Sequence, residues 1–117
     1  MPTIRDLVGA IRQREGVEAA IVLGRDGLLI DGDAAPPLNA EHIAAHSPSL
    51  VTAAEELGAA AGRGEFATAV VEYGGGVAIV AAMSRDAQLL VLARPTADIS
   101  QLLRELRRNR DNLAALA

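Results

Sequence analysis

The hydrophobic pattern of the chain is organised around a hairpin at residues 16–31, whose two apolar runs flank a Gly-Arg-Asp-Gly sequence at residues 24–27. The Asp-Gly pair supplies the positive φ that a tight turn requires. The first run, residues 19–23, is continuously apolar, which a strand tolerates only when both of its faces are covered. We therefore expect a central strand with helices on both sides.

The segments beside this hairpin predict a helix before it and a loop after it. Apolar residues recur on one helical face between Ile4 and Ile11, and Thr3 and Asp6 have the spacing of a capping box. We expect Gly16 to end this helix as its C-terminal cap. The second strand of the hairpin is expected at residues 28–31, and residues 32–37 should form a surface connection.

The longest predicted helix follows Asn39, which is a plausible N-cap. Spacings of four and three residues alternate along it, which is the period of a helix-pairing seam. A second stripe of small and apolar residues lies beside the seam, so the helix should offer one surface to its own sheet and another to a partner. Pro48 predicts a kink, or a restart of the helix with Ser47 as the cap. The seam consists of Ile43, Ser47, Leu50, Ala54, Leu57 and Ala61, and the second stripe of Ala44, Val51 and Gly58.

Three further strands are expected at residues 65–73, 77–83 and 87–93, and the links between them are too short for crossover helices. A final helix should begin after Asp98, with Gln101 at the capping-box position. The element order is then α-β-β-α-β-β-β-α. This order predicts an α+β fold in one domain, residues 1–117, with a five-stranded antiparallel sheet between helices and the strand at 65–73 at an edge.

Composition and charge exclude several functional classes. The chain is 50% hydrophobic but only 2% aromatic, so few aromatic side chains are available to stack on a base or to line a pocket for a planar ligand. The net charge of -4 is the wrong sign for general nucleic-acid binding. Without cysteine there are no disulfides or thiolate metal sites. No apolar run approaches the roughly 20 residues that span a bilayer, so we expect no membrane insertion and a cytoplasmic location.

No catalytic signature is found, so we expect neither an enzyme nor a cofactor. His42 and His46 are spaced to share one helix face, but an ordinary polar face explains them better than a metal site. Asp26 precedes a glycine and is expected to serve the turn. The glycine-rich segments 62–64 and 74–76 lack the strand-to-helix context of a nucleotide site. Arginine fingers for a GTPase are conceivable at Arg63 or Arg85, although each lies in a predicted turn.

The hairpin sequence Gly-Val-Glu-Ala-Ala-Ile-Val-Leu-Gly-Arg-Asp-Gly-Leu-Leu-Ile, starting at Gly16, resembles the first hairpin of the roadblock/dynein light chain family. The Leu-Leu-Val-Leu run at residues 89–92 and the arginine-rich terminal helix match the end of that family. The resemblance implies a homodimer, or a heterodimer of like chains, joined through the long helix and the third strand into one continuous sheet. The expected interface is the seam together with Phe66 and Val70.

Bacterial members similar to this sequence, such as the mutual gliding protein B type, often serve as partners of small Ras-like GTPases and need no catalytic residue. The resemblance therefore implies a homodimeric regulatory or scaffold protein for such a GTPase. The alternative is a structural dimerisation module of a larger assembly. A small-ligand sensor is disfavoured, because Phe66 and Tyr73 are the only rings.

Partner docking is expected at two charged surfaces. One is the outward side of the paired long helices, including Glu55 and Glu56. The other is the terminal helix, where Arg104, Arg107 and Arg108 either complement the helix dipole or meet an acidic partner or anionic surface.

Overall fold

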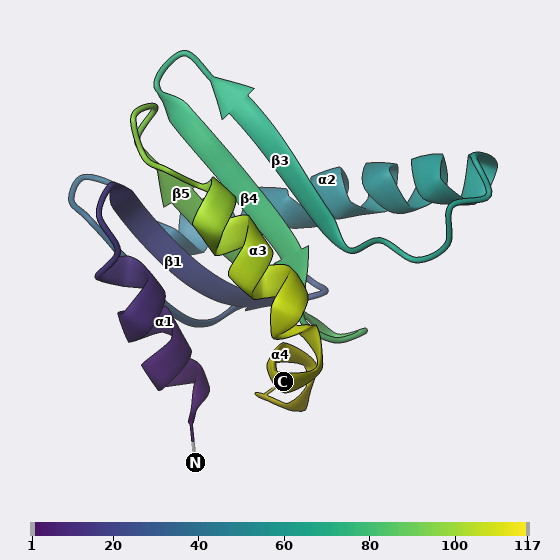
Figure 1. Ribbon diagram of the computed structural model, residues 1–117, viewed down its shortest axis with the longest axis horizontal. Coiled ribbons are helices and arrows are strands. Elements are labelled where there is room, and N and C mark those ends of the chain that lie inside the picture. Colours follow the sequence, from purple (N-terminus) through teal and green to yellow (C-terminus); the bar gives the residue numbers. More distant parts are fainter. Residues whose placement is uncertain (1, 117) are drawn as a thin grey trace.

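The computed structural model describes residues 2–116 and shows a five-stranded sheet with helices on both faces (Figure 1). All strand pairs are antiparallel, and the strand order is β2-β1-β5-β4-β3. The predicted α+β fold and element order are confirmed, with the last helix divided in two. The elements are α1 (Ile4–Arg12), β1 (Val17–Gly24), β2 (Leu29–Ala34), α2 (Ala40–Ala60), β3 (Thr68–Tyr73), β4 (Gly76–Ala82), β5 (Ala87–Ala93), α3 (Ser100–Arg108) and α4 (Arg110–Leu116).

The first hairpin strand, β1, is covered on both faces, as its continuous apolar run predicts. Ala20 and Val22 belong to the cluster under α1, α3 and α4, whereas Ala19 and Ile21 belong to the cluster under α2. The centre of the sheet is β5, and β1 lies between β5 and β2. The expectation of a central strand is therefore corrected to an inner strand, second from the edge.

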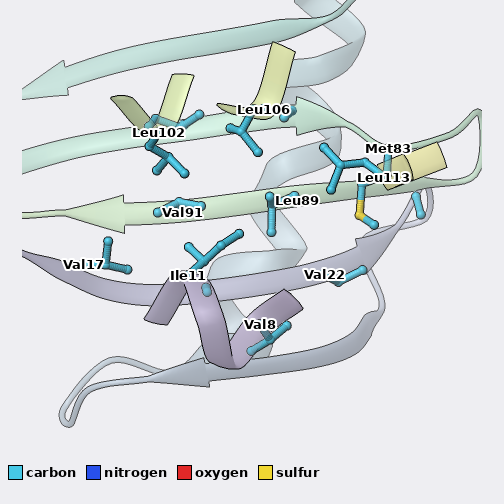
Figure 2. Close-up of a cluster of buried hydrophobic side chains, with 14 residues drawn as sticks. Val8, Ile11, Val17, Val22, Met83, Leu89, Val91, Leu102, Leu106 and Leu113 are labelled. Atoms are coloured by element: carbon cyan, nitrogen blue, oxygen red, sulfur yellow. The ribbon is translucent and has the colours of Figure 1, made fainter. Parts of the chain in front are cut away.

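The larger of the two clusters lies beneath α1, α3 and α4 (Figure 2). Val8 comes from α1, Leu106 from α3 and Leu113 from α4, and they belong to one buried cluster with Leu89 and Val91 of β5. Burial of each such side chain contributes about 1.5–3 kcal/mol to folding. The buried residues of this cluster are aliphatic, with the addition of Met83.

The first helix begins as predicted but ends earlier. The capping box is confirmed, because Thr3 and Asp6 exchange backbone-to-side-chain hydrogen bonds of 2.9 and 3.1 Å. The helix ends at Arg12 with Gln13 as its C-cap, so the placement of that cap at Gly16 is wrong. Gly16 instead has a φ of +84° in the turn into β1, where an added Cβ would lie 2.6 Å from the Cβ of Ala97.

The second strand is longer than predicted, since β2 continues through residues 32–34, which were expected to be a loop. Its backbone pairs with β1 as far as Ala34, opposite Ala19, with a register irregularity near Val22. The long partner strand thus extends β2 through a Gly-Asp-Ala sequence of low strand propensity. At the other edge, β3 begins at Thr68, three residues later than predicted.

The long helix α2 is continuous through Pro48, so the predicted restart at Ser47 is wrong. Asn39 is confirmed as the N-cap and accepts the backbone N–H of His42 at 3.0 Å. Ser47 is buried and donates to Oε1 of Gln88 at 3.3 Å. With Ala44 and Val51 it forms the side of α2 that packs on the sheet.

The final helix is interrupted at Asn109, whose Nδ2 donates to the Glu105 carbonyl at 2.9 Å. Ile99 is the N-cap of α3, so the prediction of Asp98 is wrong by one residue. Asp98 accepts the Ser100 N–H at 3.0 Å and stabilises the turn that precedes the helix. The chain changes direction at Asn109, and α4 lies beyond the C-terminal end of α3 (Figure 1).

Candidate protein interaction surface

The second half of α2 projects past the edge of the sheet formed by β3 (Figure 1). The first half is held by the buried residues Ala44, Ser47 and Val51, and α2 packs mainly on β1 and β2. In the described part of the chain, no residue of α2 after Val51 is buried. Leu57 is 70% exposed on this projecting half, although it is a large apolar residue.

The strand β3 is an edge strand, as the sequence predicts, and within residues 2–116 it pairs only with β4. The register places Val71 and Tyr73 on the α2 side of the sheet and Val70 on the opposite side. Tyr73 is 63% exposed and Val70 is 42% exposed. An open edge with exposed apolar side chains beside an apolar helix stripe is typical of an interaction surface.

The predicted interface residues divide among three environments. Ile43, Ser47 and Leu50 pack against the sheet of their own chain and anchor α2. Leu57 and Ala61 are exposed along or just after the projecting half, with Ala54 partly exposed beside them. Phe66 packs against the cluster under α2, and Val70 lies on the edge strand. Of the second stripe, Ala44 and Val51 are buried against the sheet of the same chain, whereas Gly58 is partly exposed on the projecting half.

Arg25 connects three elements at one end of the sheet and was not identified from the sequence. Its guanidinium lies 3.0 Å from Oε1 and 3.2 Å from Oε2 of Glu55 on α2. Its backbone N–H donates to the Asp86 carbonyl in the β4–β5 turn at 3.0 Å. Since Glu55 is engaged by Arg25, Glu56 is the more accessible of the two carboxylates expected to dock a partner.

The candidate arginines lie on separate surfaces. Arg104, Arg107 and Arg108 are exposed on α3, on the side of the sheet opposite α2. Arg63 is exposed in the loop between α2 and β3, and Arg85 is exposed in the β4–β5 turn. A mixed polar and apolar cavity of about 840 Å³ lies near that turn and includes Arg25, Phe66, Gln88 and Arg110 in its lining.

The turn interpretation of Asp26 is confirmed. Its Oδ1 accepts the Leu28 N–H at 3.0 Å, and Gly27 has a φ of +87°. Gly76, the last glycine of the triple-glycine segment and the first residue of β4, has a φ of +154° and pairs with Tyr73 across the β3–β4 turn. These geometries assign the two segments to hairpin turns.

His42 and His46 lie with their ring centroids 5.0 Å apart. Among residues 2–116 there is no group of three or more side chains of the metal-binding types close enough to hold an ion. No helix in the described range is both long and apolar enough to cross a bilayer.

A chelator is expected to leave the thermal stability unchanged. A metal bound to the folded state would stabilise it by mass action, and its removal would lower the melting temperature. Differential scanning fluorimetry with and without EDTA measures this, with His42→Ala/His46→Ala as the comparison. A fall in melting temperature with EDTA in the unaltered protein only would show that the two histidines hold a metal.

Comparisons with known proteins agree on the fold. The profile of the Roadblock/LC7 domain matches residues 3–93. A Roadblock/LC7 domain structure from Streptomyces avermitilis has 24% identity and a TM-score of 0.79, covering 92% of this chain and 90% of that chain. The gliding protein MglB from Thermus thermophilus has 18% identity and a TM-score of 0.83, covering 97% of this chain and 87% of that chain.

A structure described as MglB with a tetrameric arrangement has 19% identity and a TM-score of 0.84, covering 97% of this chain and 86% of that chain. No curated protein matches the chain.

Proposed function

Because this chain belongs to the Roadblock/LC7 domain family, we propose that it is a homodimeric regulator or scaffold for a small Ras-like GTPase, without catalytic residues of its own. The observation that carries the proposal is the projecting half of α2 beside the unpaired edge of β3. This surface occurs in a fold shared with MglB at low identity.

Self-association pairs the free edge of β3 and covers the exposed apolar residues of α2 at the same time. Two β3 edges pair antiparallel about a two-fold axis, which satisfies both rows of free backbone groups and joins the two sheets. The projecting halves of the two α2 helices then cover each other's exposed apolar residues, Leu57 and Ala61 among them. Assembly through β3 stops at two copies, because each chain contributes its single β3 edge.

The GTPase assignment rests on the sequence resemblance to GTPase partners and on the structural similarity to MglB. A partner that repositions the switch loops of a GTPase requires a rigid, two-copy platform and no nucleophile. The paired α2 helices provide such a platform, with Glu56 on its outward side. The arginines of α3 lie on the other side of the sheet and form a separate charged surface.

The dimer is expected to bind its cognate Ras-like GTPase more tightly in the triphosphate state. Only the γ-phosphate and its Mg²⁺ order the switch loops that a partner recognises. Isothermal titration calorimetry against the GTPase loaded with GDP or with a non-hydrolysable GTP analogue measures the difference. The first GTPase to test is one encoded beside this chain in its genome. Equal affinity for both states would instead support a passive dimerisation module.

If the protein accelerates GTP hydrolysis by its partner, we expect the acceleration to persist when Arg63 or Arg85 is replaced. Arg63 lies in the loop between α2 and β3 and Arg85 in the β4–β5 turn. Because the proposed mechanism repositions residues of the GTPase itself, Arg63→Ala and Arg85→Ala should keep most of the stimulated rate. A supplied arginine finger accounts for about 10³–10⁵ in rate, so its loss would be unmistakable. Single-turnover phosphate release with each variant gives the measurement. Loss of nearly all stimulation in either variant would identify a finger and contradict this mechanism.

A further inference from the structure

A second face of the molecule carries an apolar groove that the α2 and β3 surface leaves free. The groove lies between α1 and the α3 and α4 helices, on the opposite side of the sheet from α2, and has a volume of about 940 Å³. Ile4, Leu7 and Leu116 line it and are only partly buried, so they are accessible to a further apolar group. Leu102 and Leu106 of α3 contribute to its lining as well.

The helices around this groove are basic, whereas the rest of the chain is acidic. Residues 3–15 and 100–116 contain seven of the eleven arginines but only four of the fifteen acidic residues. These two segments therefore have a net charge of +3, whereas the remainder of the chain has -7. The groove is thus on the basic face of an acidic protein.

The charge exposed around the groove is mainly positive. Arg5 lines the groove on the α1 side with its side chain 86% exposed, and its Nε lies 3.8 Å from Oδ2 of Asp31. Arg108 is exposed on α3, next to the lining residue Asn109. Glu105 lines the groove, but its carboxylate is paired with Arg14. Asp6 is held in the capping box of α1. Glu105 and Asp6 are therefore engaged within the chain. Arg108 on α3 and Asp111 on α4 are exposed and have no ion pair within the described residues.

We propose that this groove binds an amphipathic helix of a partner protein whose apolar face is flanked by Asp or Glu residues. The part of the lining on α1, from Ile4 to Ile11, spans about 10 Å, which matches about two turns of a bound helix. Apolar anchors at i, i+3 or i+4, and i+7 would then reach Leu7 and its neighbours, while carboxylates meet Arg5 on one side and the exposed Arg108 of α3 on the other. A flat anionic membrane cannot reach apolar side chains at the bottom of a groove between helices.

The test uses a fluorescein-labelled, stapled helical peptide of about 18 residues, long enough to extend beyond both ends of the groove. It has Leu at i, i+3 and i+7 and Glu on both flanks, and a matched peptide has Lys in place of every Glu. In anisotropy titrations, the acidic peptide is expected to bind at least about tenfold more tightly than its basic match. Amide resonances of α1, α3 and α4 should shift on binding, and those of α2 should not.

Two charge-reversed proteins locate the contact. The double variant Arg5→Glu/Arg108→Glu is expected to weaken binding of the acidic peptide about tenfold. The control is Arg63→Glu/Arg107→Glu, which has the same net charge but changes one remote arginine and one on the side of α3 away from Glu105. This control should bind nearly as well as the unaltered protein. Leu57→Glu should also retain peptide binding, which separates this groove from the proposed dimer and GTPase surface.

Several outcomes would overturn the proposal. Equal affinity for the two peptides, an equal loss in the control variant, or resonance shifts centred on α2 would each remove the groove as an acidic-helix site. Capture of the protein by vesicles of phosphatidylglycerol and phosphatidylcholine, without peptide binding, would indicate a membrane surface. A sedimentation mass that falls in Arg5→Glu/Arg108→Glu would indicate that a second copy occupies the groove.

Discussion

A Leu57→Glu variant is expected to sediment as a folded monomer at concentrations at which the unaltered protein sediments as a dimer. Leu57 is 70% exposed on the projecting half of α2, so its replacement disturbs no contact that holds the single chain together. In the proposed dimer the same side chain is buried at a helix seam. An unpaired carboxylate there costs on the order of 3–5 kcal/mol, which weakens association by roughly two to four orders of magnitude.

The measurement is sedimentation velocity at micromolar concentration, with far-ultraviolet circular dichroism to show that the fold is retained. Thr52→Glu provides the matched control, because Thr52 is exposed on another side of the same helix and lies off the seam. This control should remain dimeric. If Leu57→Glu also stays dimeric, the α2 seam does not form the interface. If the unaltered protein is already a monomer at these concentrations, the homodimer proposal itself fails.

The apparent melting temperature should also fall in Leu57→Glu, although the monomer has lost no internal contact. Dimerisation stabilises the folded chain by mass action, so the dimer melts at a temperature that rises with protein concentration. The variant should lose this concentration dependence.

A Gly76→Ala variant is expected to lose about 2–4 kcal/mol of unfolding free energy, with a melting temperature lower by roughly 8 °C or more. Gly76 has a φ of +154°, in a region that residues with a Cβ scarcely occupy. An added Cβ would also lie 2.6 Å from the carbonyl oxygen of Ala93 on β5. Relief of this clash requires β4 and β5 to separate at the end of the hairpin that carries the β3 edge.

The control is Gly75→Ala, in the same turn, because a Cβ at Gly75 meets no atom within 4 Å and its φ is not in the positive region. Urea denaturation followed by circular dichroism compares the two variants. We expect Gly75→Ala to remain within a few tenths of a kcal/mol of the unaltered protein. Equal stability of both variants would contradict the assignment of Gly76 as the constrained residue of the turn.

Local signals in the sequence were sufficient for the type and order of the elements and for several of their ends. The capping box of Thr3 and Asp6, the N-cap Asn39 and the Asp-Gly turn at residues 26–27 each depend on residues a few positions apart. The continuous apolar run of β1 predicted helices on both faces of the sheet. The short links predicted the antiparallel meander of β3, β4 and β5, and the prediction that β3 is an edge strand is confirmed.

The candidate interaction surface was predicted in outline only. The seam of α2 was recognised from its spacing, but the spacing does not show where the sheet ends. The structure separates Leu50, which packs on the sheet, from Leu57, which projects past it. It also shows that Glu55 is engaged within the chain by Arg25, thirty positions earlier.

The sequence by itself determined the type and order of the elements, because helix caps, turns and hydrophobic periods are properties of neighbouring residues. Only the tertiary structure decided how far β2 extends, which stripe of α2 faces the sheet, and that α1, α3 and α4 enclose a groove with basic rims. Each of these depends on residues far apart in the chain. Ala34 pairs with Ala19, Ser47 bonds to Gln88, and Arg14 reaches Glu105. A local sequence pattern does not predict which distant group will pair with a given strand edge, hydroxyl or charged side chain.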